Sequence, residues 1–235
     1  MIILSVDLVS ELAGQRSYDI VLVCWTVQES ETMVLEIWFE FASTYSYLTV
    51  LRAEAVLHSQ NVPFEWKPFL LGPIFRDKGM NTSPFVLDPQ KGAYMWRDLE
   101  RRAAHYGLPY AKPPIFPMNP ILAARIMISA LDEAWCGDFA KAVFRAQFVH
   151  GLNIADSDVL ADALRSCGAD PDRFLDLARD DSVKAALRTQ TYEAQNLNIF
   201  GAPTFKVGQE LFWGDDRLED AIAWFKKEAP ASGLP

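Results

Sequence analysis

Residues 34–48 read Val-Leu-Glu-Ile-Trp-Phe-Glu-Phe-Ala-Ser-Thr-Tyr-Ser-Tyr-Leu, and this stretch decides the fold because it predicts a buried strand, a tight turn and a helix start. β-branched and aromatic residues dominate Val34 to Phe41, as is typical of an inner strand that is covered on both faces. An apolar stripe then predicts a helix from about Leu48 until Asn61-Val62-Pro63 ends it. Ser43 is therefore expected where the strand ends and the helix begins. The free N–H groups of a helix start favour an anion there.

The length and composition of the chain predict a soluble globular protein. Its 235 residues are 50% hydrophobic, which is enough for a large core. A formal net charge of -9, without any basic cluster, argues against nucleic acid and anionic membrane surfaces as partners. No apolar run reaches the length of a membrane span, and the first residues lack the basic start and small-residue cleavage site of a signal peptide.

The cysteines and histidines predict no metal site. Cys24, Cys136 and Cys167 are widely spaced and form no CxxC pair, and three histidines are too few to complete a Cys/His ligand pattern. We therefore expect neither structural zinc nor a disulfide scaffold, and this cysteine usage fits a reducing cytoplasm. No role is assigned to the histidines, which are His58, His105 and His150.

After the first helix, the chain predicts a strand and then a long helical block. The second strand is expected over Phe64 to Leu70, parallel to the first. Leu71 to Pro84 is predicted to be a loop from its Gly, Pro and Asn content, and a helix follows from Lys91 to the stop at Gly107. Further helices are predicted over Ile121–Ala134, Asp138–Val149, Asp156–Cys167, Pro171–Asp180 with Asp170 as N-cap, and Asp181–Asn196.

The last part of the chain predicts two strands and a closing helix. Phe200 to Gly214 reads as two strands joined at Val207-Gly208-Gln209, and Asp215 is expected to cap a helix that runs through Phe225. The strands at the two ends of the chain can then share one mixed sheet. Ligand sites in such sheets lie beyond the carboxyl ends of the strands, which is where Ser43 is expected.

This order predicts one α/β domain that carries a helical insertion. The α/β domain is expected to comprise residues 33–85 and 197–228, and the inserted helical domain residues 86–196. Met33 stands directly before the first convincing strand, so residues 1–32 are predicted to be a mobile N-terminal extension. Residues 229–235 are expected to form a tail.

Two short motifs resemble the thioredoxin fold. Ser43-Thr44-Tyr45-Ser46 stands at the turn where redox members carry CxxC, and Ala202-Pro203-Thr204 resembles the cis-proline turn of that fold. A hydroxyl does not exchange with disulfides, so dithiol chemistry at this turn is excluded.

Longer blocks are similar to 2-hydroxychromene-2-carboxylate isomerases, which are DsbA-like relatives of the kappa-class glutathione transferases. The similarity spans about Met33 to Lys227 and keeps the family order. Two departures are Thr44, where kappa-class relatives commonly have Pro, and Asp215, where Ser or Asn is frequent. The blocks are Phe39-Glu-Phe-Ala-Ser-Thr-Tyr-Ser-Tyr-Leu48, Gly79-Met-Asn-Thr-Ser-Pro84, Lys91-Gly-Ala-Tyr-Met-Trp-Arg-Asp-Leu-Glu-Arg101, Phe200-Gly-Ala-Pro-Thr-Phe205 and Phe212-Trp-Gly-Asp-Asp-Arg-Leu218.

The resemblance implies a glutathione site around Ser43. The first Ser of the turn binds the glutathione sulfur in that family, so Ser43 is implied to be catalytic, and its alternative role is a plain helix cap. The residue before the cis-proline pairs with an extended peptide. A carboxylate after the last strand would receive the γ-glutamyl ammonium, although Asp215 can instead be only a helix cap. The implied glutathione-binding residues are Ser43, Thr44, Tyr45, Asn81, Lys91, Ala202, Pro203, Asp215 and Asp216; for Asn81 and Lys91 the alternatives are a loop amide and an exposed lysine.

Two features near this site stay open at the level of sequence. The stretch from Tyr94 to Arg101 can be a packed helix face with paired charges, or an aromatic and arginine-containing wall that suits a flat aromatic carboxylate. Glu40 can simply end its strand, or it can tune the turn electrostatically.

The resemblance implies a glutathione-dependent isomerase that interconverts 2-hydroxychromene-2-carboxylate, or a close aromatic analogue, and its open benzylidenepyruvate isomer. It also implies a role in aromatic hydrocarbon breakdown and a homodimer. A kappa-like transferase that leaves glutathione on its product is the nearest alternative. A non-catalytic peptide-binding module of the same fold is the third.

Overall fold

The computed structural model describes residues 33–229. The predicted extension at residues 1–32, with Cys24, lies outside the described residues, and so does the predicted tail beyond Ala229. The division of the remainder into an α/β domain and an inserted helical domain stays a prediction.

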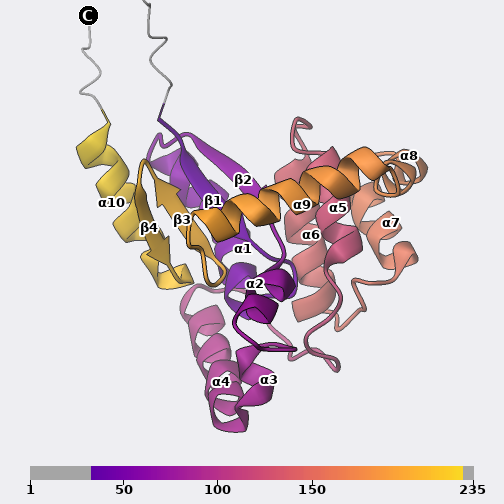
Figure 1. Cartoon of the computed structure of the whole chain (residues 1–235), viewed down its shortest axis with the longest axis horizontal. Coiled ribbons are helices and arrows are strands. Elements are labelled where there is room, and N and C mark those ends of the chain that lie inside the picture. Colours follow the sequence, from indigo (N-terminus) through magenta and orange to yellow (C-terminus); the bar gives the residue numbers. More distant parts are fainter. Residues whose placement is uncertain (1–32, 230–235) are drawn as a thin grey trace, which may run out of the picture. The chain divides into compact units, whose positions relative to one another are not determined.

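A four-stranded mixed sheet forms the centre of the fold, in the order β2-β1-β3-β4 (Figure 1). β1 (Leu35–Phe39) runs parallel to β2 (Phe64–Pro68), which the predicted crossover requires. β3 (Thr204–Val207) pairs antiparallel with the other side of β1, and β4 (Glu210–Trp213) continues the sheet beside β3. β1 is thus an inner strand, which explains its nearly continuous apolar run.

Ten α-helices are found within residues 33–229, and β4 is followed by a 3-10 helix, η2 (Asp215–Arg217). Most of them lie in the long segment between β2 and β3; in Figure 1, α5 to α8 occupy the side opposite α10, whereas α3 and α4 lie below the sheet. Their bounds are α1 Thr44–Ser59, α2 Leu71–Asp77, α3 Pro84–Leu87, α4 Pro89–His105, α5 Ile121–Ser129, α6 Cys136–Phe148, α7 Ser157–Ser166, α8 Pro171–Leu177, α9 Asp181–Asn196 and α10 Leu218–Glu228.

The side chains of β1 alternate between two apolar clusters, because successive residues of a strand point to opposite faces. Leu35, Ile37 and Phe39 belong to the larger cluster, which includes residues of α1, α6 and α10. Trp38 belongs to the smaller cluster on the other face, where α2 and the C-terminal part of α9 pack. Both faces of the inner strand are therefore covered, as its sequence predicts.

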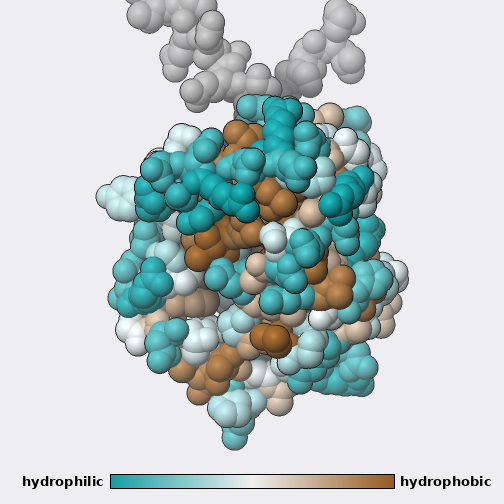
Figure 2. Space-filling view, turned by 90° about the vertical axis from the view of Figure 1, so that its right-hand side faces the viewer, coloured by the Kyte–Doolittle hydropathy of each residue, from teal (hydrophilic) through white to brown (hydrophobic). Residues whose placement is uncertain are grey.

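The helical side of the molecule buries its apolar stripes inward. In Figure 2, which views this side, hydrophilic residues cover most of the surface and apolar residues gather in smaller patches. Asp170 caps α8 as predicted, because its carboxylate accepts the N–H groups of Asp172 and Arg173. In residues 33–229, no helix is both long and apolar enough to span a membrane.

Three local predictions are wrong. Part of the loop predicted over Leu71 to Pro84 is helical, since α2 occupies Leu71–Asp77 despite its Gly-Pro pair. Proline fits there because it stands in the first turn, where its missing N–H has no partner to lose. Asp215 does not cap the closing helix: it begins η2, and its carboxylate accepts hydrogen bonds from Arg102. The helix predicted to reach Ala134 ends at Ser129.

Candidate active site

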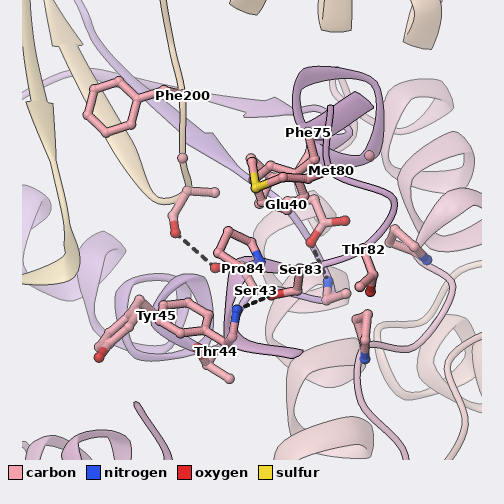
Figure 3. Close-up of a pocket in the computed structure, with 18 of the residues that line it drawn as sticks. Glu40, Ser43, Thr44, Tyr45, Phe75, Met80, Thr82, Ser83, Pro84 and Phe200 are labelled. Carbon is pink, nitrogen blue, oxygen red and sulfur yellow. Dashed lines mark hydrogen bonds between the residues drawn. The ribbon is translucent and has the colours of Figure 1, made fainter. Parts of the chain in front are cut away.

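Ser43 lies at the junction of β1 and α1, and its hydroxyl makes two hydrogen bonds. Its Oγ accepts the N–H of Ser46 at 3.2 Å, so Ser43 is the N-cap of α1. The same hydroxyl donates to the carbonyl oxygen of Ala202 at 2.9 Å (Figure 3). The Ala202–Pro203 peptide bond is cis, as the resemblance to the thioredoxin fold implies. The structure therefore joins two motifs that lie far apart in the sequence.

A cavity of about 880 Å³ opens beside Ser43 at the carboxyl end of β1. Its walls come from the turn after β1, from the segment 70–85, from the connector 116–121 and from the loops on either side of β3 and β4. Helix α4 closes a further side. Figure 3 shows side chains of the turn and of the segment 70–85 converging on this cavity. Its volume lies in the range usual for sites that bind small molecules.

Eight of the nine residues that the resemblance implies for glutathione line this one cavity. Pro203 is the exception: it is buried behind Ala202, and its carbonyl oxygen accepts the N–H of Gly214. Asn81 and Lys91 are exposed at the rim, and the Lys91 ammonium lies 3.7 Å from the Asp88 carboxylate. The structure brings these residues together, and their contacts with a ligand stay a prediction.

The two acidic residues after β4 lie in different environments. Asp215 is 2% exposed, and its Oδ2 accepts two hydrogen bonds from the guanidinium of Arg102, at 2.9 and 2.7 Å. Burial raises the pKa of Asp215, and the hydrogen bonds and charge of Arg102 oppose this. Asp216 is exposed, and its carboxylate lies 3.3 Å from the Arg217 guanidinium. Asp216 is therefore the carboxylate that a ligand can approach.

Tyr45 points from α1 toward α4. Its hydroxyl donates to Oδ2 of Asp98 at 3.0 Å, and its ring lies 6.3 Å from the ring of Phe85. Burial and the neighbouring Asp98 carboxylate raise the pKa of Tyr45, so its hydroxyl stays protonated at neutral pH. Tyr45 thus forms a neutral wall of the cavity.

The stretch from Tyr94 to Arg101 does not give the cavity an arginine-containing wall. Tyr94 lines it, but Arg97 and Arg101 do not. They form exposed ion pairs with Glu100 and Asp98 on the same helix, at 2.5 and 3.2 Å. For these two arginines, the alternative of a helix face with paired charges is correct.

The cavity also contains cations and apolar residues that the sequence does not identify as part of the site. Arg76 and Lys78 line the cavity, and neither has an acidic partner within 4.0 Å among the ion pairs of residues 33–229. The only sequence signal for Arg76 and Lys78 as cavity residues is that they are two basic residues in the segment that follows the second strand. The apolar walls are formed by Phe75, Met80, Phe85, Phe116, Pro117 and Met118.

Glu40 is a buried carboxyl group that also lines the cavity. It is 6% exposed, and its Oε2 accepts the N–H of Ala42 at 2.8 Å. Burial raises its pKa to about 8, and hydrogen bonds from the backbone of Ala42 and Ser43 only partly oppose this. No basic side chain forms an ion pair with it among the described residues. Glu40 is therefore mostly protonated at pH 7.

The described part of the chain offers no cluster of three or more His, Cys, Asp or Glu side chains that could hold a metal ion. None of the three histidines lines the cavity. The polar chemistry near Ser43 thus comes from hydroxyl, amide, carboxyl and cationic side chains.

Comparison with known proteins agrees with the fold. The chain is 26% identical to a 2-hydroxychromene-2-carboxylate isomerase of Sphingobium xenophagum, over 80% of this chain and 95% of that protein. It is 28% identical to glutathione S-transferase kappa 2 of Caenorhabditis elegans, over 79% of this chain and 88% of that protein. The solved structure of a 2-hydroxychromene-2-carboxylate isomerase superposes with a TM-score of 0.75 at 24% identity, covering 83% and 95% of the two chains.

A family model places the chain more firmly than any single relative. Residues 34–222 match the model of the DSBA-like thioredoxin domain, which is most of the sequence. The predicted thioredoxin-like fold with helices between its two parts is thereby confirmed. The protein belongs to the DSBA-like thioredoxin family.

Proposed function

We propose that this protein is a glutathione-dependent isomerase of the 2-hydroxychromene-2-carboxylate type. The observation that carries the proposal is the position of Ser43, whose hydroxyl caps α1 and contacts Ala202 at the wall of a large cavity. Relatives that carry this activity in their names match most of the chain. A role in aromatic hydrocarbon breakdown, a cytoplasmic location and a homodimer belong to the same proposal.

Ser43 and the start of α1 would stabilise the thiolate of glutathione. A free thiol has a pKa of about 8.5, and hydrogen bonds together with the positive end of a helix favour its ionised form. In the structure, the Ser43 hydroxyl donates to Ala202. Donation to a bound sulfur therefore requires the hydroxyl to rotate away from that carbonyl. The carbonyl of Ala202 is then free to accept an N–H group of the peptide.

The remaining groups of the cavity fit the other parts of glutathione and an aromatic acid. Asp216 offers a carboxylate to the γ-glutamyl ammonium, and the rim cations offer charge to carboxylates. The apolar walls formed by the segments 70–85 and 116–121 suit a flat ring. Arg76 and Lys78 stand beside these walls and can attract the carboxylate of such a ring.

The proposed reaction balances without any oxidant or reductant. The cyclic hemiketal of the substrate first opens: its hydroxyl gives up a proton, the ring C–O bond breaks, and the released phenolate takes up a proton, which leaves a ketone conjugated with the carbon–carbon double bond. The thiolate then adds to the far carbon of that double bond, and the electron pair of the double bond moves to the carbonyl oxygen. Rotation then occurs about the carbon–carbon bond that the addition has made single. The electron pair then re-forms the double bond and expels the thiolate, so that glutathione is regenerated.

The experiment measures the optical rate of conversion of 2-hydroxychromene-2-carboxylate to its open isomer, with and without glutathione. Wild type, Ser43→Ala and Ser59→Ala are compared. Ser59 is a matched control because it lies on the same helix, and its exposed hydroxyl donates to the carbonyl oxygen of Val56 within its own turn. We expect conversion only with glutathione. Ser43→Ala should lose most of its turnover, whereas Ser59→Ala should keep the wild-type turnover. Equal turnover in Ser43→Ala would remove Ser43 from the mechanism.

A glutathione transferase of the kappa type is the second candidate, and the 28% identity to glutathione S-transferase kappa 2 favours it. It would use the same thiolate and leave glutathione on the product. A product heavier by one glutathione identifies a transferase. Absence of both conversion and glutathione binding would favour a non-catalytic binding module.

A further inference from the structure

A buried ion pair holds the loop that follows β4. Arg102 on α4 donates from Nε and Nη2 to a single oxygen, Oδ2 of Asp215, at 2.9 and 2.7 Å. The Asp215 side chain is 3% exposed and that of Arg102 is 25% exposed. Loss of one partner of such a pair leaves the other charge buried and uncompensated. The position of the loop therefore depends on both residues.

Two other contacts fix the same loop from other directions. Arg52 on α1 donates from Nη2 to the backbone carbonyl of Asp215 at 2.6 Å, and its Nη1 pairs with Glu219. The N–H of Gly214 donates to the carbonyl of Pro203 at 3.0 Å. Three elements, α1, α4 and the cis-proline loop, thus converge on residues 214 and 215.

The group that this loop presents to the cavity is Asp216. Its side chain is 47% exposed, and it lines the cavity together with Gly214. Gly214 has a φ of +119°, and a Cβ there would lie 2.6 Å from Oδ1 of Asp216. The Asp216 carboxylate thus lies against the Cα of Gly214. The contacts of Arg102, Arg52 and Pro203 with this loop maintain the backbone conformation of Gly214.

We propose that Arg102 and Asp215 form a positioning clamp that places Asp216 to receive the ammonium of the γ-glutamyl end of glutathione. The inference rests on the proposed function in one respect, that glutathione is the ligand. In this clamp Arg102 and Asp215 bond to each other through Oδ2 of Asp215, and neither serves as a ligand contact. The clamp residues act through Asp216 and determine selectivity for the γ-glutamyl group.

Direct roles for the same two residues predict opposite effects. If Asp215 itself bound the ammonium, Arg102→Gln would strengthen binding, because it frees the carboxylate. If Arg102 bound a carboxylate of the ligand, Asp215→Asn would strengthen binding, because it frees the guanidinium. The clamp predicts that each variant weakens binding.

The test is calorimetric titration with glutathione and with cysteinylglycine, which keeps the thiol but lacks the γ-glutamyl residue. The proteins are wild type, Asp215→Asn, Arg102→Gln, their double variant and Asp216→Asn. Arg97→Gln is the matched control, since Arg97 lies on the same helix in an exposed ion pair. We expect Asp215→Asn, Arg102→Gln and Asp216→Asn each to lose glutathione affinity on the order of tenfold and cysteinylglycine affinity less than twofold, whereas Arg97→Gln should bind both ligands as wild type does. The double variant should bind no more weakly than the weaker single, because the two residues act as one unit.

Several results would overturn the clamp. Tighter glutathione binding in either single variant assigns that variant's partner to the ligand directly. Equal losses for both ligands mean that the ion pair supports only the fold. Wild type that binds no glutathione overturns the proposed cofactor and this inference with it. Should Arg102→Gln fail to fold, Arg102→Lys keeps the charge but loses the paired hydrogen bonds, and the clamp predicts a smaller loss that is still selective for glutathione.

Discussion

Replacement of Glu40 by glutamine should make the protein more stable at high pH and flatten the pH dependence of its stability. Glu40 is buried beside the turn, and burial raises its pKa from the ordinary value of 4.5 to about 8. Each tenfold change in an acid constant corresponds to about 1.4 kcal/mol. The difference between folded and unfolded chain therefore amounts to about 5 kcal/mol.

The sign follows from where the proton is held. Between pH 4.5 and about 8, the unfolded chain has released the Glu40 proton and the folded chain keeps it. Raising the pH through this window therefore favours the unfolded chain. From pH 5.5 to 8.5, wild type should lose about 3 kcal/mol through this single group, and the loss should level off above pH 8. Glutamine keeps an oxygen that can accept the N–H of Ala42 and has no proton to release.

The assay is urea unfolding at pH 5.5, 7.0 and 8.5 for wild type, Glu40→Gln and Glu100→Gln. Glu100 is an exposed carboxylate on α4, so its variant serves as the matched control and should keep the wild-type pH dependence. Taking the difference between proteins cancels the other titrating groups, which they share. A change in the free energy difference between wild type and Glu40→Gln of less than about 1 kcal/mol across this range would refute the reasoning.

Three more substitutions test separate parts of the structure. Ser43→Ala should lower the free energy of unfolding by about 1 kcal/mol through loss of the α1 cap, measured by urea unfolding; an unchanged value would mean that the cap contributes nothing. Gln147→Met should raise it by about 1 kcal/mol, because both polar atoms of the fully buried Gln147 amide lack a hydrogen-bond partner among residues 33–229; destabilisation in thermal melts would show that the amide is satisfied. Gly214→Ala should destabilise by at least ~1 kcal/mol and weaken glutathione binding, because a Cβ at a φ of +119° is strained and meets Asp216; calorimetry that finds unchanged affinity would contradict this.

The sequence predicts the fold well where local chemistry decides it. The apolar run of β1, the cap at Asp170 and the turn before β4 are all set by residues that act within a few positions of one another. The sequence does not predict α2 because a Gly-Pro pair is typical of loops, although proline is tolerated in a first helical turn. Here the packing of Leu71 and Ile74 against Trp38 favours the helix, and no local pattern reveals that contact.

The same distinction between local and distant contacts applies to the residues of the candidate site. The position of Ser43 follows from a strand and helix that are adjacent in sequence, whereas the partner of Asp215 lies 113 positions away on α4. Sequence alone therefore indicated an acidic pair but not which carboxylate is occupied. The same limit applies to Glu40, whose charge depends on burial by segments far along the chain.

The protonated state of Glu40 also explains how an acid can line the proposed site for a thiolate. Two negative charges in one partly buried cavity repel each other, so an ionised Glu40 would raise the pKa of a thiol bound at Ser43. With its own pKa near 8, Glu40 is mostly neutral at pH 7 and removes that repulsion. By linkage, a bound thiolate raises the pKa of Glu40 further. The burial that costs stability at high pH thus keeps the turn suited to a single anion near neutral pH.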